Sequence, residues 1–150
     1  MQPLSLPAFD YKIKPAGQYD TIFDVVRKKH VRLTPEEWVR QHWVHYLIGH
    51  LGYPPALIRL EKGVRCQHRL QHRPDIVVYD RRAHPLLLVE CKAPGIALTK
   101  DTFGQVARYN ALFNARLLAI SNGEQHFCWE IKPHAPHPHL LPQVPPFDAL

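Results

Sequence analysis

Apolar and polar positions recur with two different periods along the chain, and the first long run has the period of a helix. The apolar positions of this run, three or four residues apart, are Val39, Trp43, Tyr46, Leu47 and Leu51. Thr34 and Glu37 form a Thr-x-x-Glu capping box before them, with Pro35 in the first turn. The sequence Gly-Tyr-Pro-Pro at 52–55 ends the run. This pattern predicts an amphipathic helix near the beginning of the chain.

The pattern that follows predicts strands, with a second helix among them. Strand signals lie at about 57–66, 75–79, 86–92, 116–121 and 126–131. The helix is expected at about 100–115, and Asn122-Gly123 is the expected turn between the last two strands. The third signal, LLLVECK, is apolar on both faces near its start, which is typical of a central strand covered on both sides. The order of elements predicts an α/β fold, an α+β sandwich with helices packed on a mixed sheet.

The two ends of the chain differ from this central pattern. Residues 8–33 contain short alternating runs broken at Pro15, which predict a small β-hairpin. Residues 133–150 are rich in Pro and His and have no regular period, so we expect an extended tail that lies on the surface or is disordered. We therefore predict a single domain over residues 1–132, with its core at about 34–131.

The charge balance indicates the kind of partner. Lys and Arg number 19 against 13 Asp and Glu among 150 residues, a formal net charge of +6, and polyanions, nucleic acid first, are the expected partners. No stretch approaches the roughly 18 apolar residues of a membrane helix, and the N-terminus does not resemble a signal peptide. We therefore expect a cytoplasmic protein without membrane contact, whose three widely spaced cysteines are reduced thiols.

A candidate site lies where two of the strand signals meet polar residues. Asp75 opens one strand, and Glu90 and Lys92 end the next, where alternation places them on one face with Cys91 on the other. If the two strands pair as a hairpin, the two carboxylates converge at one end of the sheet. Two carboxylates, a backbone carbonyl such as that of Cys91, and waters are a usual incomplete ligand set for Mg²⁺. The lysine would orient or deprotonate a water, or stabilise charge on phosphorus.

Both predicted helices add polar groups that could face this site. At 100° per residue Glu36 lies in the apolar arc of the first helix, so we expect it to point toward the sheet, with Arg40 as its partner one turn later. Glu37 is expected to serve the capping box. Gln105 and Tyr109, four residues apart on the second helix, share a face that could hold a phosphate or a carboxylate.

Simpler interpretations of the same residues stay open. Glu90 and Lys92 could form an ordinary surface ion pair, and Glu36 could merely favour the positive end of its helix. Gln105 and Tyr109 could be an exposed Gln beside a half-buried Tyr. Against these, a central apolar strand that places two ionisable groups on one face at its end needs partners or a function.

Basic residues gather between 59 and 82, where seven Lys and Arg stand against three acids. Arg69 and Arg73 lie nearest to Asp75 and are expected to contact a phosphate backbone without reading bases. The alternative is a solvated basic surface. The Cys-x-His-xxx-His spacing at 66–72 does not indicate a zinc site, because it has no convincing fourth ligand.

Taken together, these motifs resemble the PD-(D/E)XK nuclease superfamily. The matching residues are Pro74-Asp75, Glu90-Cys91-Lys92, and Gln105 with Tyr109 in a Gln-xxx-Tyr helix. Over roughly residues 11–131 the chain is similar to the N-terminal nuclease domain of type I restriction enzyme R subunits, and most of all to small stand-alone bacterial proteins that carry this domain.

The resemblance implies a restriction-endonuclease-like αβββαβ core and Mg²⁺-dependent hydrolysis of DNA phosphodiesters, with Mn²⁺ as a substitute. It implies that Asp75 and Glu90 bind the metal, that Lys92 serves the attacking water and that Glu36, with Arg40, supplies a helical acid. Gln105 and Tyr109 would complete the site. R subunits carry motor domains that these 150 residues do not contain, so we expect no translocation.

Two other classes of function remain. The chain could be a nuclease-fold module that binds nucleic acid or assembles with other proteins without cutting, or a structural domain with an incidental Glu90–Lys92 ion pair. Besides DNA, the expected partners are a second copy of the chain or a protein that supplies a motor or specificity function.

Overall fold

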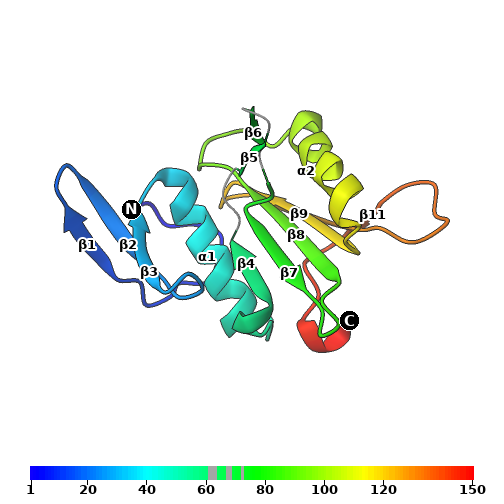
Figure 1. The fold of residues 1–150 in the computed structure, drawn as a ribbon, viewed down its shortest axis with the longest axis horizontal. Helices are drawn as coiled ribbons and strands as arrows, with labels where there is room; N and C mark the ends of the chain where they lie inside the picture. The colour runs from blue at the N-terminus through cyan, green and yellow to red at the C-terminus, as the bar shows by residue number, and fades with distance from the viewer. Residues whose placement is uncertain (61–63, 67–68, 72) are drawn as a thin grey trace.

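A computed structural model describes residues 1–60, 64–66, 69–71 and 73–150, with the backbone alone for 64–66 and 69–71 (Figure 1). The main elements, in chain order, are β1 (Ile13–Ala16), β2 (Tyr19–Asp24), β3 (Lys29–Arg32), α1 (Pro35–Gly49), β4 (Ile58–Leu60), β5 (Val64–Cys66), β6 (Arg69–Gln71), β7 (Ile76–Tyr79), β8 (Pro85–Cys91), α2 (Lys100–Phe113), β9 (Leu117–Ser121), β10 (His126–Glu130) and β11 (His139–Leu141). Short 3-10 turns lie at Pro55–Leu57 and Phe147–Ala149. In the described part of the chain, no helix combines the length and apolar character needed to cross a bilayer.

The largest sheet has six strands in the order β11-β10-β9-β8-β7-β4. Strands β8 and β9 are parallel, and the other neighbours are antiparallel. Parallel neighbours need a crossover connection, which α2 provides here. The series α1, β4, β7, β8, α2, β9 is the αβββαβ core that the family resemblance implies, and the predicted fold class is confirmed.

The central strands are buried on both faces, as the LLLVECK run predicts. Leu87 packs in the core cluster that contains Trp43 of α1, whereas the next residue, Leu88, packs in the cluster that contains Val106 of α2. Alternation along β8 therefore feeds two separate cores, one under each helix. Each such apolar side chain stabilises the fold by roughly 1.5–3 kcal/mol.

The N-terminal segment forms a sheet of three strands, β1-β2-β3, where the sequence predicted a hairpin. The third strand follows a turn that Asp24 stabilises, since its carboxylate accepts from the backbone N–H groups of Val26 and Arg27 at 2.8 and 2.9 Å. Lys28 closes this turn in the left-handed region with φ 56°. Figure 1 shows the sheet projecting beyond α1, away from the main sheet.

The C-terminal segment also differs from the expected tail. Residues 139–141 form β11, which pairs with β10 at the edge of the main sheet. Val144 is buried, and the backbone N–H of Phe147 donates to the carbonyl of Leu51 at 2.8 Å. The Tyr53 hydroxyl donates to the Pro145 carbonyl at 2.8 Å. The apolar residues of this Pro-rich segment thus cover the core beside α1, although they follow no regular period.

Candidate active site

The candidate site is a cleft of about 510 Å³ between the first turns of α1, the end of β8 and the middle of α2. Eight of the side chains predicted from the sequence line this cleft: Glu36, Arg40, Arg73, Asp75, Glu90, Lys92, Gln105 and Tyr109. Arg69 and the residues of the Cys-x-His-xxx-His spacing lie outside the side chains that the structure describes. The fold therefore gathers residues from α1, β7, β8 and α2 in one place.

A larger hollow of about 800 Å³ lies near the opposite end of β8, beside Pro85. Four basic residues line it (Arg81, Arg82, Arg116 and Lys132), and Asp80 is the one acid in its described lining. A lone carboxylate among basic groups does not suit a hard cation. The smaller cleft is therefore the candidate active site.

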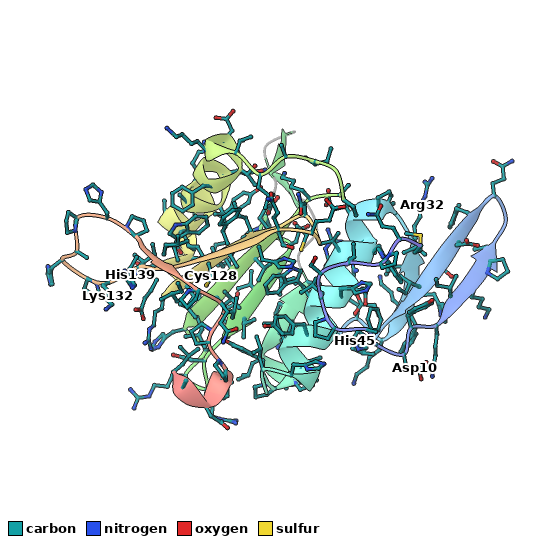
Figure 2. All side chains as sticks on the ribbon, turned by 180° about the vertical axis from the view of Figure 1, so that it is seen from behind. Asp10, Arg32, His45, Cys128, Lys132 and His139 are labelled. Atoms are coloured by element: carbon teal, nitrogen blue, oxygen red, sulfur yellow. The ribbon has the colours of Figure 1, made fainter. Side chains whose placement is uncertain are left out.

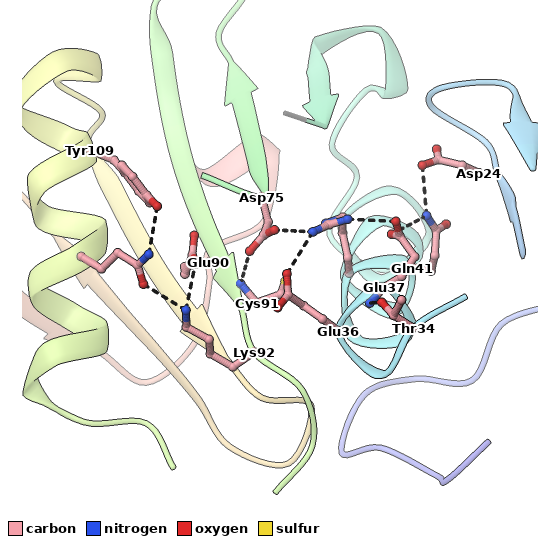
Figure 3. Close-up of polar contacts among 12 residues, drawn as sticks. Asp24, Thr34, Glu36, Glu37, Gln41, Asp75, Glu90, Cys91, Lys92 and Tyr109 are labelled. Carbon is pink, nitrogen blue, oxygen red and sulfur yellow. Dashed lines mark hydrogen bonds and ion pairs between the residues drawn. The ribbon is translucent and has the colours of Figure 1, made fainter. Parts of the chain in front are cut away.

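The hairpin of β7 and β8 brings the two predicted metal ligands together. Ile76 lies opposite Val89 in the antiparallel pair. Asp75 comes just before Ile76 and Glu90 just after Val89, so the two acids lie at the same end of the hairpin. One oxygen of Asp75 accepts from the backbone N–H of Cys91 at 2.7 Å, and the other is bonded to the guanidinium of Arg40 (Figure 3). Asp75 is thus held on both sides, by β8 and by α1.

Glu90 is less well satisfied than Asp75. Its side chain is 8% exposed, and one oxygen accepts from Lys92 Nζ at 3.5 Å. The other oxygen is buried with no hydrogen-bond partner among the described residues. Burial, followed by the charge of Asp75, raises the pKa of Glu90 to about 8, although Lys92 opposes the shift. Without an additional positive charge this carboxyl therefore keeps its proton at neutral pH.

Helix α2 positions the lysine. Lys92 Nζ donates to Gln105 Oε1 at 3.0 Å, and Gln105 Nε2 donates to the hydroxyl of Tyr109 at 3.0 Å. Figure 3 shows this chain running from β8 to the helix. Burial and then the charge of Glu90 raise the pKa of Tyr109, so the phenol stays neutral. The Gln-xxx-Tyr face therefore acts on the site through Lys92.

On α1 the carboxylate of Glu37 has a role that the sequence analysis did not anticipate. Glu37 was expected to serve the capping box, and its backbone N–H does donate to Thr34 Oγ1 at 3.1 Å. Its carboxylate, however, is buried and accepts from Arg27 and Arg40, both at 2.9 Å. The Glu36 side chain lines the cleft but is 46% exposed. The turn between β2 and β3 covers the Glu37 side of the helix, which the helical spacing alone could not reveal.

Arg40 pairs with three acids and not with Glu36 alone. Its guanidinium bonds to Asp75, to Glu37 at 2.9 Å and to Glu36 at 3.3 Å. Burial works against its charged form, but Asp75 and Glu37 outweigh burial, so the pKa of Arg40 is raised above its usual value. The guanidinium therefore remains charged and links α1 to the start of β7.

Sequence reasoning missed the residues of the N-terminal segment that contact α1 beside the cleft. Asp24 is fully buried and accepts from Arg27 Nε at 2.6 Å and from Gln41 Nε2 at 3.0 Å. Arg27 in turn reaches Glu37, so charges alternate from the N-terminal sheet to the cleft. The Asp-x-x-Arg spacing at 24–27 was the available signal for the local pair, but nothing in the sequence indicated that α1 would lie against it.

The oxygens at the cleft suit a hard divalent cation such as Mg²⁺. Two acids stand side by side, and the unpartnered oxygen of Glu90 lacks a positive charge that a cation would supply. Within the described residues, no three His, Cys, Asp or Glu side chains form a ready-made metal cluster. A metal would therefore depend on Asp75, Glu90, the Cys91 carbonyl and waters, with Glu36 as a further candidate.

The fold and the cleft define a mixed α+β protein of nuclease-like architecture. Residues 35–145 match the family described as "Type I restriction enzyme R protein N terminus (HSDR_N)". Because the match spans more than half of the chain, the protein belongs to this family, and the resemblance to the N-terminal domain of type I R subunits is confirmed. A search of curated proteins finds no match. The matched range starts with α1, so β1–β3 lie outside it.

Proposed function

We propose that this protein is a metal-dependent nuclease that hydrolyses phosphodiester bonds in DNA. The observation that carries the proposal is the convergence of Asp75, Glu90 and Lys92 on one cleft. The family is that of a restriction enzyme component, which supports a nuclease-like domain and a place in restriction-modification. The positive net charge of the chain supports a polyanionic substrate.

In this proposal the acids hold the metal and the lysine assists the reaction. Asp75, Glu90 and the Cys91 carbonyl would bind Mg²⁺ or Mn²⁺, with Glu36 as a candidate fourth group. The bound ion supplies Lewis acidity and lowers the pKa of a coordinated water. Glu90 would hold the cation as the deprotonated carboxylate. Lys92, held between Glu90 and Gln105, presents its ammonium to the attacked phosphate and offsets the charge that develops there.

The remaining groups position these residues. Arg40 and the Cys91 backbone N–H fix the two oxygens of Asp75. Tyr109 fixes Gln105, and Gln105 fixes Lys92. Arg73 lines the cleft and would contact the phosphate backbone of the substrate.

The test is cleavage of duplex, single-stranded and branched DNA with Mg²⁺, with Mn²⁺ and with EDTA. We expect cleavage only with metal, and we expect Lys92→Ala to abolish it while thermal unfolding is unchanged. Lys100→Ala is the matched control, since Lys100 is exposed on α2 and does not line the cleft. Cleavage that survives in Lys92→Ala, or no cleavage by the wild-type protein on any substrate, would overturn the proposal.

A second candidate is a nuclease-fold module that binds DNA or assembles with a partner without cutting. It is favoured by the ion pair between Asp75 and Arg40, which engages a proposed metal ligand with a side-chain cation. Calorimetric titration with Mg²⁺ separates the two candidates when combined with the cleavage test. Metal binding without DNA cleavage favours the module. A second copy of the chain, or a protein that supplies a motor or specificity function, would then be the next partner to test.

A further inference from the structure

The outer face of the N-terminal sheet is an ordered basic surface outside the family match. In the strand register Thr21 lies between Lys14 and Arg32, and Phe23 lies opposite His30. The backbone carbonyl of Lys12 accepts from the N–H of Phe23 at 2.9 Å, which continues the ladder. Alternation therefore gives two cross-strand rows on one face: Lys14, Thr21 and Arg32 in the first, and Lys12, Phe23 and His30 in the second.

Each row carries a basic side chain at both edges of the sheet. Lys12, Lys14, His30 and Arg32 are all exposed. The two acids of β2 point to the opposite face by alternation, where Asp24 is buried and neutralised by Arg27. The described residues of the three strands thus place basic and no acidic side chains on the outer face.

The charge of the chain is concentrated in this segment. Residues 11–33 carry six Lys and Arg against two Asp, whereas residues 35–145 carry 13 against nine. The same net charge of +4 therefore lies in a segment about a fifth as long as the family-matched region. Such a density attracts polyanions and makes their binding depend on salt.

The sheet is also fixed in place, so its basic rows form a preorganised surface. Ile22 is fully buried, and Arg27 ties the β2–β3 turn to Glu37 of α1. The preceding residues pack on the same helix, where the ring of Phe9 stacks on His45 with centroids 4.1 Å apart. On the outer face the Arg32 guanidinium lies 4.9 Å from the centre of the Tyr19 ring. Figure 2 shows the sheet projecting from the rest of the protein, with Arg32 on the part of the sheet that is nearest to it.

We propose that the outer face of β1–β3 binds the phosphodiester backbone of a nucleic acid and guides it to the cleft. Arg32 belongs to both features, because it ends the first basic row and also lines the cleft with Val31. The lysines of the β1 edge would contact phosphates further along the same strand. Tyr19 and Phe23 offer aromatic surface between the two basic edges, against which exposed bases can stack. The guidance to the cleft rests on the proposed nuclease function, whereas the binding itself does not.

The test compares two double variants that remove the same charge from different places. Lys12→Gln with Lys14→Gln neutralises the β1 edge, and Lys100→Gln with Lys132→Gln neutralises two exposed lysines that do not line the cleft. Binding to a labelled DNA duplex and to the single strand of the same sequence is measured in EDTA over a series of salt concentrations. EDTA prevents metal-dependent cleavage, so that binding is observed alone.

We expect the β1-edge variant to bind about tenfold more weakly than the wild-type protein. For a duplex, the slope of log Kd against the logarithm of the salt concentration should also be smaller by about two. The control variant should bind as the wild-type protein does. The duplex and single-strand measurements show which form the surface prefers. Equal binding by the β1-edge variant and the wild-type protein, or an equal loss in the control variant, would overturn the proposal.

The same experiment separates this proposal from the nuclease proposal. Loss of binding in the β1-edge variant supports the surface even if the wild-type protein never cuts DNA with metal. Cleavage that depends on Lys92, together with unchanged binding in the β1-edge variant, keeps the nuclease and removes the surface.

Discussion

One wall of the cleft is formed by α1 and the other by β8, and the charged side chains of the two walls are paired to different extents. On the α1 wall, Glu37 accepts from Arg27 and Arg40 at 2.9 Å, and Arg40 also neutralises Asp75. On the β8 wall, Glu90 keeps a buried oxygen without a partner among the described residues, and its pKa rises to about 8. On the first wall the buried carboxylates are paired with arginines, although Arg40 Nε and Gln41 Oε1 have no hydrogen-bond partner among the described residues. The carboxyl of the second wall is the group that gains most from an added cation.

This contrast separates stability from activity. Removing one partner of a buried ion pair leaves an uncompensated charge and costs about 3–5 kcal/mol. Replacing a carboxyl that is already protonated by a neutral group of the same shape costs little. Substitutions on the α1 wall should therefore lower stability, and those on the β8 wall should lower activity.

After Lys92→Ala, the largest effect is expected for Glu90→Gln. The amide preserves the shape of the protonated carboxyl, so the midpoint of thermal unfolding should stay the same or rise. The amide cannot replace an anionic metal ligand, so metal-dependent DNA cleavage should fall by roughly 10²-fold or more, because a bound metal ion stabilises the transition state by several kcal/mol and each 1.4 kcal/mol is about a factor of ten. Unfolding curves and cleavage rates on the same preparations provide the check. A large loss of stability would mean that Glu90 is part of the structural wall.

On the α1 wall the neighbouring glutamates form a matched pair. Glu37→Ala should lower the free energy of unfolding by about 3–5 kcal/mol, because Arg27 and Arg40 lose a buried partner. Glu36→Ala should change it by about 1 kcal/mol or less, since the Glu36 side chain is 46% exposed. Urea unfolding of both variants measures the difference. Equal losses would contradict the assignment of Glu37 as the buried acid.

The pH dependence of stability should carry the signature of Glu90. Its pKa is about 8 in the folded protein against about 4.5 in the unfolded chain. Between these values the folded state holds a proton that the unfolded state has released, so the free energy of unfolding falls as the pH rises, by about 1 kcal/mol per pH unit.

Urea unfolding at several pH values between 5 and 8 tests this expectation. Glu90→Gln should flatten the decline, and Mg²⁺ should stabilise the wild-type protein more at pH 8 than at pH 5. The same slope in the wild-type protein and in Glu90→Gln would show that the decline has another origin.

The smallest effects are expected for substitutions on α2, where Gln105→Ala leaves Lys92 without its acceptor. One lost hydrogen bond of about 1 kcal/mol corresponds to a roughly fivefold slower cleavage step. Tyr109→Phe tests the next link of the chain and should have a weaker effect, because it leaves the Lys92–Gln105 bond in place. A stronger effect of Tyr109→Phe would mean that the phenol contacts the substrate directly.

Local patterns in the sequence were sufficient for the central core and for part of the site. The apolar run before Glu90 predicted a doubly covered strand, and the structure places Leu87 and Leu88 in separate cores. The spacing of Asp75, Glu90 and Lys92 predicted their convergence because strand alternation and hairpin pairing are local rules. The four-residue spacing of Gln105 and Tyr109 likewise predicted a shared helix face.

Contacts between distant segments could not be predicted in this way. Helical spacing placed Glu37 in the cap, but it could not show that the β2–β3 turn lies against α1 and buries the Glu37 carboxylate. The residues after 138 show no period, yet β11 and Val144 close the edge of the core. In both cases burial depends on which segment arrives from elsewhere in the chain.

The sequence alone thus determined the order of helices and strands in the core and eight of the residues that line the cleft, because periodicity and spacing act within one element or one hairpin. Only the tertiary structure decided which of those charges are paired. Arg40 reaches Asp75 because α1 packs across the start of β7, and Arg27 reaches Glu37 because the N-terminal sheet docks on the helix. Whether a carboxylate is paired with a cationic side chain or keeps an unpartnered oxygen depends on neighbours within a few ångströms in space, which the order of residues does not specify.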